Sequence, residues 1–321
     1  MKIHIPNSAW LGNIDPFLRS FGTSNPGRLE ISAHQQWISV HPVVLSMVTA
    51  LGLDCKPENI AFLNLEARSK HYLERMGLFR LLKVRSGIKI TEHESSGRFI
   101  PLTQIKEART LETFIEDVIP LLHLEPKQAQ PIRYIISELA RNVFEHSQSE
   151  IGAILCAQYY KKSNTIRLGI VDRGVGIKQT ISNAYTTKND VDAIRLALSP
   201  GITGTTRRIG GTAQNVGAGL FFIKSIAKTN RDFFMIYSGK GMYKLLKTSL
   251  RQKVRIYADP LRDKHSKSND FPHWQGTAIG VDLNLDNHAE FNDLLSIIYD
   301  IFQKTVTEKR KEYYRKRARF I

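Results

Sequence analysis

The sequence has few of the features that mark membrane, disulfide-rich or metal-binding proteins. Its only two cysteines, Cys55 and Cys156, each lie in an apolar stretch, which favours small buried side chains over a disulfide framework or a zinc site. No apolar run approaches the roughly 18 residues that a membrane-spanning helix needs. Residues 1–6 also lack the apolar region of a signal peptide. We therefore expect a cytoplasmic protein without a membrane partner.

Acidic residues are in deficit, with 30 Asp and Glu against 46 Lys and Arg, so the formal net charge is +16. The excess of basic residues is concentrated in residues 224–267 and in the tail from 304 to 319. This charge makes nucleic acid, nucleotide phosphates and acidic proteins candidate partners, but it does not choose among them. The chain has 321 residues, 42% of them hydrophobic, which is enough for two modest cores or one large core with a satellite.

Residues 1–100 show an alternation of strand and helix patterns. Residues 28–32 and 60–65 predict strands, and residues 43–53 predict an amphipathic helix between them. These patterns indicate a small α/β unit. Residues 97–105 then form a short crossing segment that leads into the next part of the chain.

Residues 101–287 carry helical patterns first and strand patterns afterwards. Two helices are predicted at 110–122 and 126–146. Many short strands with few helices between them favour an antiparallel or mixed sheet with helices on one face. The predicted strands cover residues 151–160, 165–171, 232–238, 253–258 and 277–285.

Polar residues recur every four positions along the predicted helix 126–146. Glu138, Asn142 and His146 lie beside the apolar stripe of this helix, where their side chains can face a cleft at the edge of the core. A helix with an ordered polar edge would give the same pattern, so this spacing alone does not decide the function.

A carboxylate and two glycines follow the predicted strand 165–171. Asp172 ends the strand, and Gly174 and Gly176 come next at alternate positions before Ile177. Glycines there let the backbone turn tightly and approach a flat ligand, while the acid accepts a hydrogen bond from it. This pattern is also found in ordinary turns, but the preceding helix with Glu138 and Asn142 makes a ligand site the stronger interpretation.

A glycine-rich segment, residues 210–219, leads into a predicted helix that begins at Leu220. Glycines such as Gly217 and Gly219 allow backbone N–H groups to reach phosphate oxygens, and the N-terminus of the following helix also favours an anion. Further along, Gly276 and Thr277 open the last predicted strand.

In this order the four motifs resemble the nucleotide-binding boxes of the GHKL superfamily, which includes gyrase-type topoisomerases, heat-shock chaperones, histidine kinases and MutL-type repair proteins. The resemblance covers roughly residues 110–287. It implies an α/β (α+β) fold, a two-layer sandwich of the Bergerat type, that binds ATP and Mg²⁺. Within this superfamily, the His146-Ser147 pair that follows the helix motif most resembles the corresponding residues of anti-sigma-factor serine kinases.

The resemblance also implies a role for each residue of the boxes. Glu138 would be the catalytic general base, and Asn142 would be the Mg²⁺ ligand. Asp172 would accept the adenine amine, and Thr277 would support the adenine end. The remaining nucleotide-binding residues would be Gly174, Gly176, Ile177, Gly217, Gly219 and Leu220.

The long segment 178–216 corresponds to the ATP lid of this superfamily, with a short helix predicted at 190–198. Arg207 and Arg208 are candidates for stabilising the terminal phosphate, although solvated lid residues would look the same. Lys188 and Lys224 are weaker candidates of the same kind.

Residues 1–100 resemble STAS-like modules in element order and in residues 71–79. Such modules are often phosphorylated before a helix, where Ser69 lies, although a helix-capping serine is the more ordinary interpretation. Three parts are therefore expected: a STAS-like domain at 1–100, an ATPase domain at 101–287, and an amphipathic and then basic helix at 288–321.

The last helix is predicted to pack on the core or on another subunit, which leaves a homodimer open. Residues 309–319 interleave cations with Tyr313 and Tyr314, which suits contact with nucleic acid as well as it suits a solvated terminus. The leading hypothesis is a regulatory ATPase that controls a protein partner. The alternatives are a serine/threonine kinase of the anti-sigma type and a nucleic-acid-associated or phage-defence ATPase.

Overall fold

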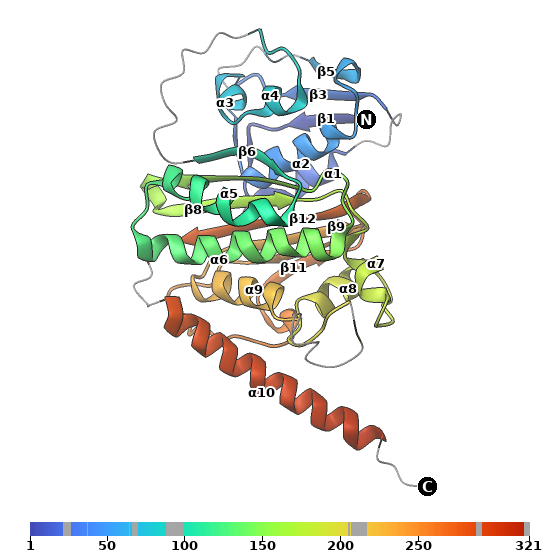
Figure 1. Ribbon diagram of the computed structural model, residues 1–321, viewed down its shortest axis with the longest axis vertical. Coiled ribbons are helices and arrows are strands. Elements are labelled where there is room, and N and C mark those ends of the chain that lie inside the picture. Colours follow the sequence, from blue (N-terminus) through green and yellow to red (C-terminus); the bar gives the residue numbers. More distant parts are fainter. Residues whose placement is uncertain are drawn as a thin grey trace.

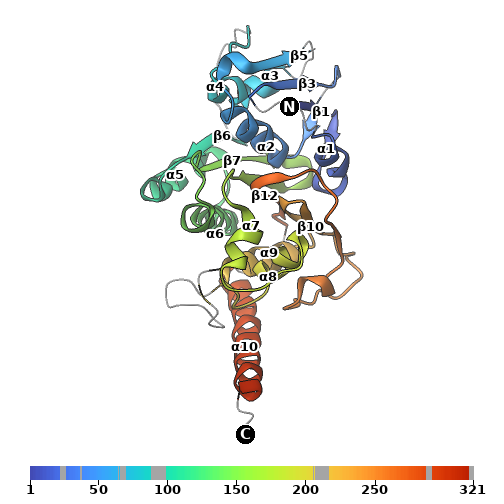
Figure 2. The same ribbon diagram turned by 90° about the vertical axis from the view of Figure 1, so that its right-hand side faces the viewer.

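The main body of the protein is a seven-stranded antiparallel sheet with helices on both faces (Figures 1 and 2). The computed structural model describes residues 1–21, 27–36, 38–63, 65, 70–87, 99–204, 206, 217–286 and 291–317. The strand order is β11-β10-β9-β12-β8-β7-β6, and every neighbouring pair is antiparallel. The strands are β6 (Phe99–Ile105), β7 (Ala153–Tyr160), β8 (Thr165–Val171), β9 (Phe234–Gly239), β10 (Gly241–Leu245), β11 (His265–Ser268) and β12 (Trp274–Asn284).

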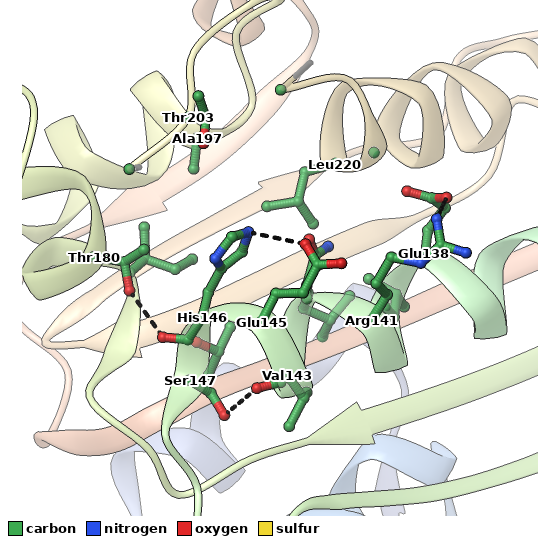
Figure 3. A pocket seen from close by; sticks show the side chains of 18 of the residues that line it. Glu138, Arg141, Val143, Glu145, His146, Ser147, Thr180, Ala197, Thr203 and Leu220 are labelled. Carbon is green, nitrogen blue, oxygen red and sulfur yellow. Dashed lines mark hydrogen bonds and ion pairs between the residues drawn. The ribbon is translucent and has the colours of Figure 1, made fainter. Parts of the chain in front are cut away.

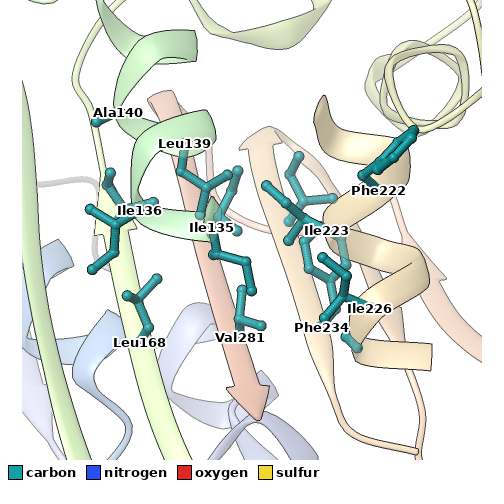
Figure 4. Packing of buried hydrophobic residues seen from close by; sticks show 14 of the residues in the cluster. Ile135, Ile136, Leu139, Ala140, Leu168, Phe222, Ile223, Ile226, Phe234 and Val281 are labelled. Carbon is teal, nitrogen blue, oxygen red and sulfur yellow. The ribbon is translucent and has the colours of Figure 1, made fainter. Parts of the chain in front are cut away.

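One face of this sheet carries helices that follow strand β6 in the chain, among them α6 (Pro126–Asn142) and α9 (Gly219–Thr229). Figure 4 shows Ile135 and Leu139 of α6 and Ile223 of α9 pointing toward Leu168 and Val281 of the sheet. Each such side chain contributes roughly 1.5–3 kcal/mol when fully buried, so these contacts fix α6 and α9 over the strands. The helices are α5 (Leu111–Val118), α6 (Pro126–Asn142), α7 (Gly176–Ser182), α8 (Asp190–Ala197), α9 (Gly219–Thr229) and α10 (Phe291–Arg317).

The N-terminal part of the chain forms a second, smaller unit. Its three-stranded parallel sheet has the order β1-β3-β5. Strands β2 and β4, which alternate with these along the chain, form a separate two-stranded parallel sheet. The elements are β1 (Lys2–Ile5), β2 (Ser8–Ala9), α1 (Asp15–Arg19), β3 (Leu29–Ala33), β4 (Ser39–Val40), α2 (Pro42–Leu53), β5 (Ile60–Leu63), α3 (Lys70–Arg75) and α4 (Leu78–Leu82).

Helix α2 differs from the amphipathic helix that the sequence predicts, because all its residues except the last are buried. It lies against β7 and β8 on the face of the large sheet opposite α6 and α9. The expectation of helices on one face only is therefore wrong: the small unit covers the second face. Ile154, Cys156 and Val171 of the large sheet belong to the same apolar cluster as α2.

Small side chains on the large sheet make room for the start of α2. Cys156, Gly169 and Gly280 are register partners on β7, β8 and β12. A Cβ atom on Gly169 would lie 2.3 Å from backbone atoms of Val43, and the Cys156 thiol donates to the carbonyl of Pro42 at 3.3 Å. The first turn of α2 thus sits directly on the sheet backbone.

A buried histidine fixes the beginning of α2. His41 Nδ1 accepts a hydrogen bond from the backbone N–H of Val43 at 3.1 Å, so its Nε2 carries the proton and donates to Asp282 Oδ1, also at 3.1 Å. Burial lowers the pKa of His41, which favours this neutral form. The pair links the small unit to strand β12.

The elements that the sequence predicts lie within a few residues of their observed bounds, with one clear error, and several short elements, such as β10 and β11, are not predicted. Residues 253–258 form no strand. Ile256 packs against the core on the helix side of the sheet. The apolar pattern of this segment therefore comes from a loop that packs on the core. Strands β10 and β11 flank this loop instead, and the crossing segment predicted at 97–105 is the edge strand β6. Within the described residues, no helix has the length and apolar character to span a membrane.

Candidate functional site

A cavity of about 400 Å³ lies between the end of α6, helix α7, the start of α9 and the end of strand β8. Figure 3 shows Glu138, Glu145 and His146 on one wall, with Leu220 across from them and Thr180 beside His146. Of the residues that the sequence predicts for the nucleotide site, the cavity is lined by Glu138, Asn142, Asp172, Gly176, Ile177, Gly217, Gly219, Leu220 and Thr277, and also by His146.

The last turns of α6 supply an acid and an amide to the cavity. Glu138 Oε1 lies 3.3 Å from Arg141 Nη1. Burial raises the pKa of the Glu138 carboxyl, Arg141 opposes this shift, and Glu145 adds to it. One turn further on, the side-chain nitrogen of Asn142 is buried and has no hydrogen-bond partner among the described residues. An unpaired buried donor is costly, which points to a ligand acceptor in the cavity.

Helix α6 ends in a π-turn, Val143–Ser147, rather than in a regular α-turn. Ser147 Oγ donates to the carbonyl of Val143 at 2.7 Å, and the Val175 N–H donates to the Ser147 carbonyl at 2.7 Å. The wider turn changes the direction of the side chains within it, and both Glu145 and His146 line the cavity. Turns of this kind are frequent at functional sites.

Gly174 has a packing role that its sequence motif does not reveal. It does not line the cavity, and a Cβ atom on it would lie 1.8 Å from the carbonyl oxygen of Ser147. The missing side chain lets the loop after β8 pack against the π-turn. Gly176, by contrast, lines the cavity and has a positive φ of 79°, a conformation that glycine adopts without strain.

Asp172 is a buried carboxylate at the end of β8. Its Oδ1 accepts the backbone N–H of Gly174 at 2.8 Å, and its own N–H donates to the Thr277 carbonyl at 2.9 Å. Burial raises the pKa of Asp172 to about 6, although the hydrogen bonds from Gly174 and Thr277 act in the opposite direction. At neutral pH the side chain is therefore an ionised acceptor in a poorly solvated position.

The start of α9 closes the other side of the cavity. Gly219 is the first residue of α9, and a Cβ atom on it would lie 2.6 Å from Glu138 Oε2. Gly217 has a positive φ of 67°, and its carbonyl accepts the Gly201 N–H at 3.1 Å. This bond joins Gly201, inside the predicted lid, to Gly217, which directly follows the lid and lines the cavity. Arg207, Arg208 and residues 210–216 lie outside the described residues, as does Ser69.

The two lysines proposed for the phosphates are not at the cavity. Lys224 is fully buried on α9, where its Nζ lies 2.8 Å from Asp263 Oδ2 and donates to the Tyr257 carbonyl at 2.9 Å. Its charge is thus neutralised inside the protein, and the proposed phosphate role is wrong. Lys188 is exposed and does not line the cavity either.

Several lining residues carry no signal in the predicted motifs. Glu145 and Thr180 lie close to the motifs in the sequence, and the lining also includes Tyr134 and Thr203. Tyr299 comes from α10, far along the chain, and lies at the mouth with half of its surface exposed. No local pattern could have assigned Tyr299, since only the packing of α10 against α9 and α6 brings it there.

The residues at the cavity fit a bound Mg²⁺ that is shared with a phosphate ligand. Among the described residues there is no cluster of three His, Cys, Asp or Glu side chains that could hold a metal ion by themselves. Mg²⁺ bound with nucleotides needs only one or two protein ligands, because phosphate oxygens and waters complete its shell. The Asn142 carboxamide oxygen can supply such a protein ligand.

Two comparisons of the chain with known proteins found no match. No protein-family model matches it, and no curated protein matches it. The arrangement of the residues in the cavity therefore carries the functional argument.

Proposed function

We propose that the protein is a regulatory ATPase of the GHKL type that binds ATP with Mg²⁺ in this cavity and changes its contact with a protein partner according to the bound nucleotide. The observation that carries the proposal is the convergence of Glu138, Asn142 and Asp172 on one cavity from α6 and the end of β8. An antiparallel sheet with α6 and α9 on one face is consistent with a Bergerat fold. The small parallel sheet at the N-terminus is consistent with a STAS-like unit.

Each of the three side chains has a chemical task in this proposal. Ionised Asp172 accepts a hydrogen bond from the exocyclic amine of adenine, beside Thr277 and Ile177. Asn142 would hold Mg²⁺ near the phosphates, where the ion would supply positive charge. Glu138 accepts the proton of the attacking hydroxyl or water, a role suited by the raised pKa of its carboxyl.

Calorimetric titration with ATP, with and without Mg²⁺, tests the site. Asp172→Asn replaces the acceptor with a neutral amide, so ATP affinity should fall at least tenfold. Glu138→Gln should retain ATP binding and lose more than 90% of turnover, since general bases typically contribute 10²–10⁴-fold. Asp300→Asn on the exposed face of α10 removes an equal charge and should change neither quantity. Unchanged ATP affinity in Asp172→Asn would refute the proposed site.

The same site could transfer the phosphoryl group to water or to a protein hydroxyl, because Glu138 can deprotonate either. Incubation with ATP labelled on the terminal phosphate separates these reactions. Label released as free phosphate supports the ATPase, whereas label retained on a protein would assign a serine/threonine kinase. An ATP-dependent activity of either kind agrees with a cytoplasmic location.

A further inference from the structure

A second hollow, of about 340 Å³, lies between the C-terminal end of α9 and the loop that joins β10 to β11. It shares no lining residue with the cavity that contains Asp172. Its lining contains five basic side chains and no acidic one. The lining residues are Lys228, Thr248, Gln252, Lys253, Arg255, Tyr257, Arg262 and Lys264.

The acidic residues of this loop are already paired with cations from other elements. Asp259 forms a two-bond contact with Arg195 of α8, at 2.7 and 3.0 Å. Asp263 pairs with Lys224 and Lys228 of α9, at 2.8 and 3.4 Å. Of the five basic side chains around the hollow, the loop's own carboxylates therefore pair only with Lys228.

Four cations of the hollow have no such partner. Within the part of the chain that the structure describes, Lys253, Arg255, Arg262 and Lys264 form no ion pair. Like charges held around one hollow repel each other, and a bound anion removes this repulsion. The Arg262 guanidinium lies over the ring of Tyr257, 4.6 Å from its centre, and this contact restrains its position.

A buried hydroxyl adds a second, independent feature. The Oγ1 atom of Thr248 is buried and has no hydrogen-bond partner among the described residues, although Thr248 lines the hollow. A hydroxyl without a partner is a free donor for an anion oxygen. Guanidinium, ammonium and hydroxyl donors together match the tetrahedral oxygens of a phosphate group.

We propose that this hollow is a binding site for phosphate groups, carried by the backbone of a nucleic-acid strand or by a free polyphosphate. The site is separate from the nucleotide cavity but connected to it by one helix. Gly219 at the start of α9 lines the nucleotide cavity, and Lys228 near its end lines the hollow.

The test compares two variants that lose the same charge on different surfaces. Lys253→Gln/Arg255→Gln removes two cations from the hollow. The control, Lys161→Gln/Lys162→Gln, removes two exposed cations from the turn between β7 and β8. Binding of a fluorescein-labelled single-stranded DNA 20-mer is followed by anisotropy at several salt concentrations. Binding of inorganic pyrophosphate is followed by calorimetry.

The hollow variant should bind at least one of these probes fivefold or more weakly than the control variant does. If the strand is the ligand, the slope of log affinity against log salt should also fall by about 1–2, one for each lost phosphate contact. Loss of pyrophosphate binding alone would identify a free polyphosphate as the ligand. Equal effects in both double variants, or no effect in either, would overturn the proposal. ATP affinity should stay unchanged in both, so failure here is distinguishable from failure of the nucleotide site.

Discussion

Asp172 is a charged side chain in a position where charge is costly. It is 3% exposed, and its pKa of about 6 lies above the ordinary value of 3.8. Because the folded state holds the proton more tightly than the unfolded state does, ionised Asp172 opposes folding above pH 6. This cost disappears as the pH falls through 6 toward 4. A buried charge that lowers the stability of the folded state is typical of a binding site, because the ligand needs that charge.

Asp172→Asn should therefore stabilise the protein without ligand while it weakens ATP binding. At pH 7.5 we expect a higher free energy of unfolding by up to about 3 kcal/mol, and the gain should shrink toward zero near pH 4. Denaturant titrations of both proteins between pH 4 and 7.5 measure this difference. The exposed control Asp300→Asn should differ little from wild type at any pH. A variant Asp172→Asn that is less stable than wild type at pH 7.5 would contradict this account.

At the scale of elements, the contact between α2 and the large sheet depends on an absent side chain. Gly169→Ala places a Cβ atom 2.3 Å from backbone atoms of Val43, a contact that no change of side-chain conformation can relieve. We expect a loss of about 3 kcal/mol or more in the free energy of unfolding, the upper end of overpacking costs. Chemical denaturation measures it. Gly12→Ala is the matched control, since its Cβ would meet only the edge of the Phe233 ring at 3.2 Å. Equal losses in the two variants would argue against this contact.

Elements whose local pattern agrees with their environment could be predicted from the sequence. Strand β8 occupies the predicted residues 165–171, because alternate residues meet two different apolar layers. Helix α2 was predicted at nearly the correct bounds but with the wrong exposure. Its polar residues, such as Ser46 and Thr49, hydrogen-bond inside the protein, so they do not mark a solvated face.

The site was predictable where its residues are close in the sequence. Glu138 and Asn142 share a helix, and Asp172 ends a strand, so their positions follow from the local periodicity. The π-turn that contains Glu145 is held by a local bond from Ser147 to Val143 and by a bond from Val175, and the second bond comes from the loop that follows β8. Contacts of that kind leave no periodic signal.

At the scale of the whole molecule, α10 connects the C-terminal part of the chain with the nucleotide cavity. Phe302 on its buried face packs near Phe221 and Phe222 of α9, with ring centres 6.4 and 6.0 Å apart. Further along, Lys309 Nζ donates to the Pro200 carbonyl at 3.1 Å, within the predicted lid segment 178–216. A partner that binds the exposed part of α10 would therefore act on both the helix layer and the lid segment.

Lys309→Met tests this connection, because methionine keeps the apolar length of the side chain and removes the donor. Losing one hydrogen bond of about 1 kcal/mol to the lid segment should weaken ATP binding about fivefold, with little change in overall stability. Lys304→Met, on the exposed face of the same helix, controls for the loss of charge and should leave ATP affinity unchanged. The measurement is ATP titration of both variants. Equal weakening in both variants would mean that general electrostatic attraction, and not the contact with Pro200, affects ATP binding. In that case α10 would influence the cavity only through the packing of its apolar face on α9.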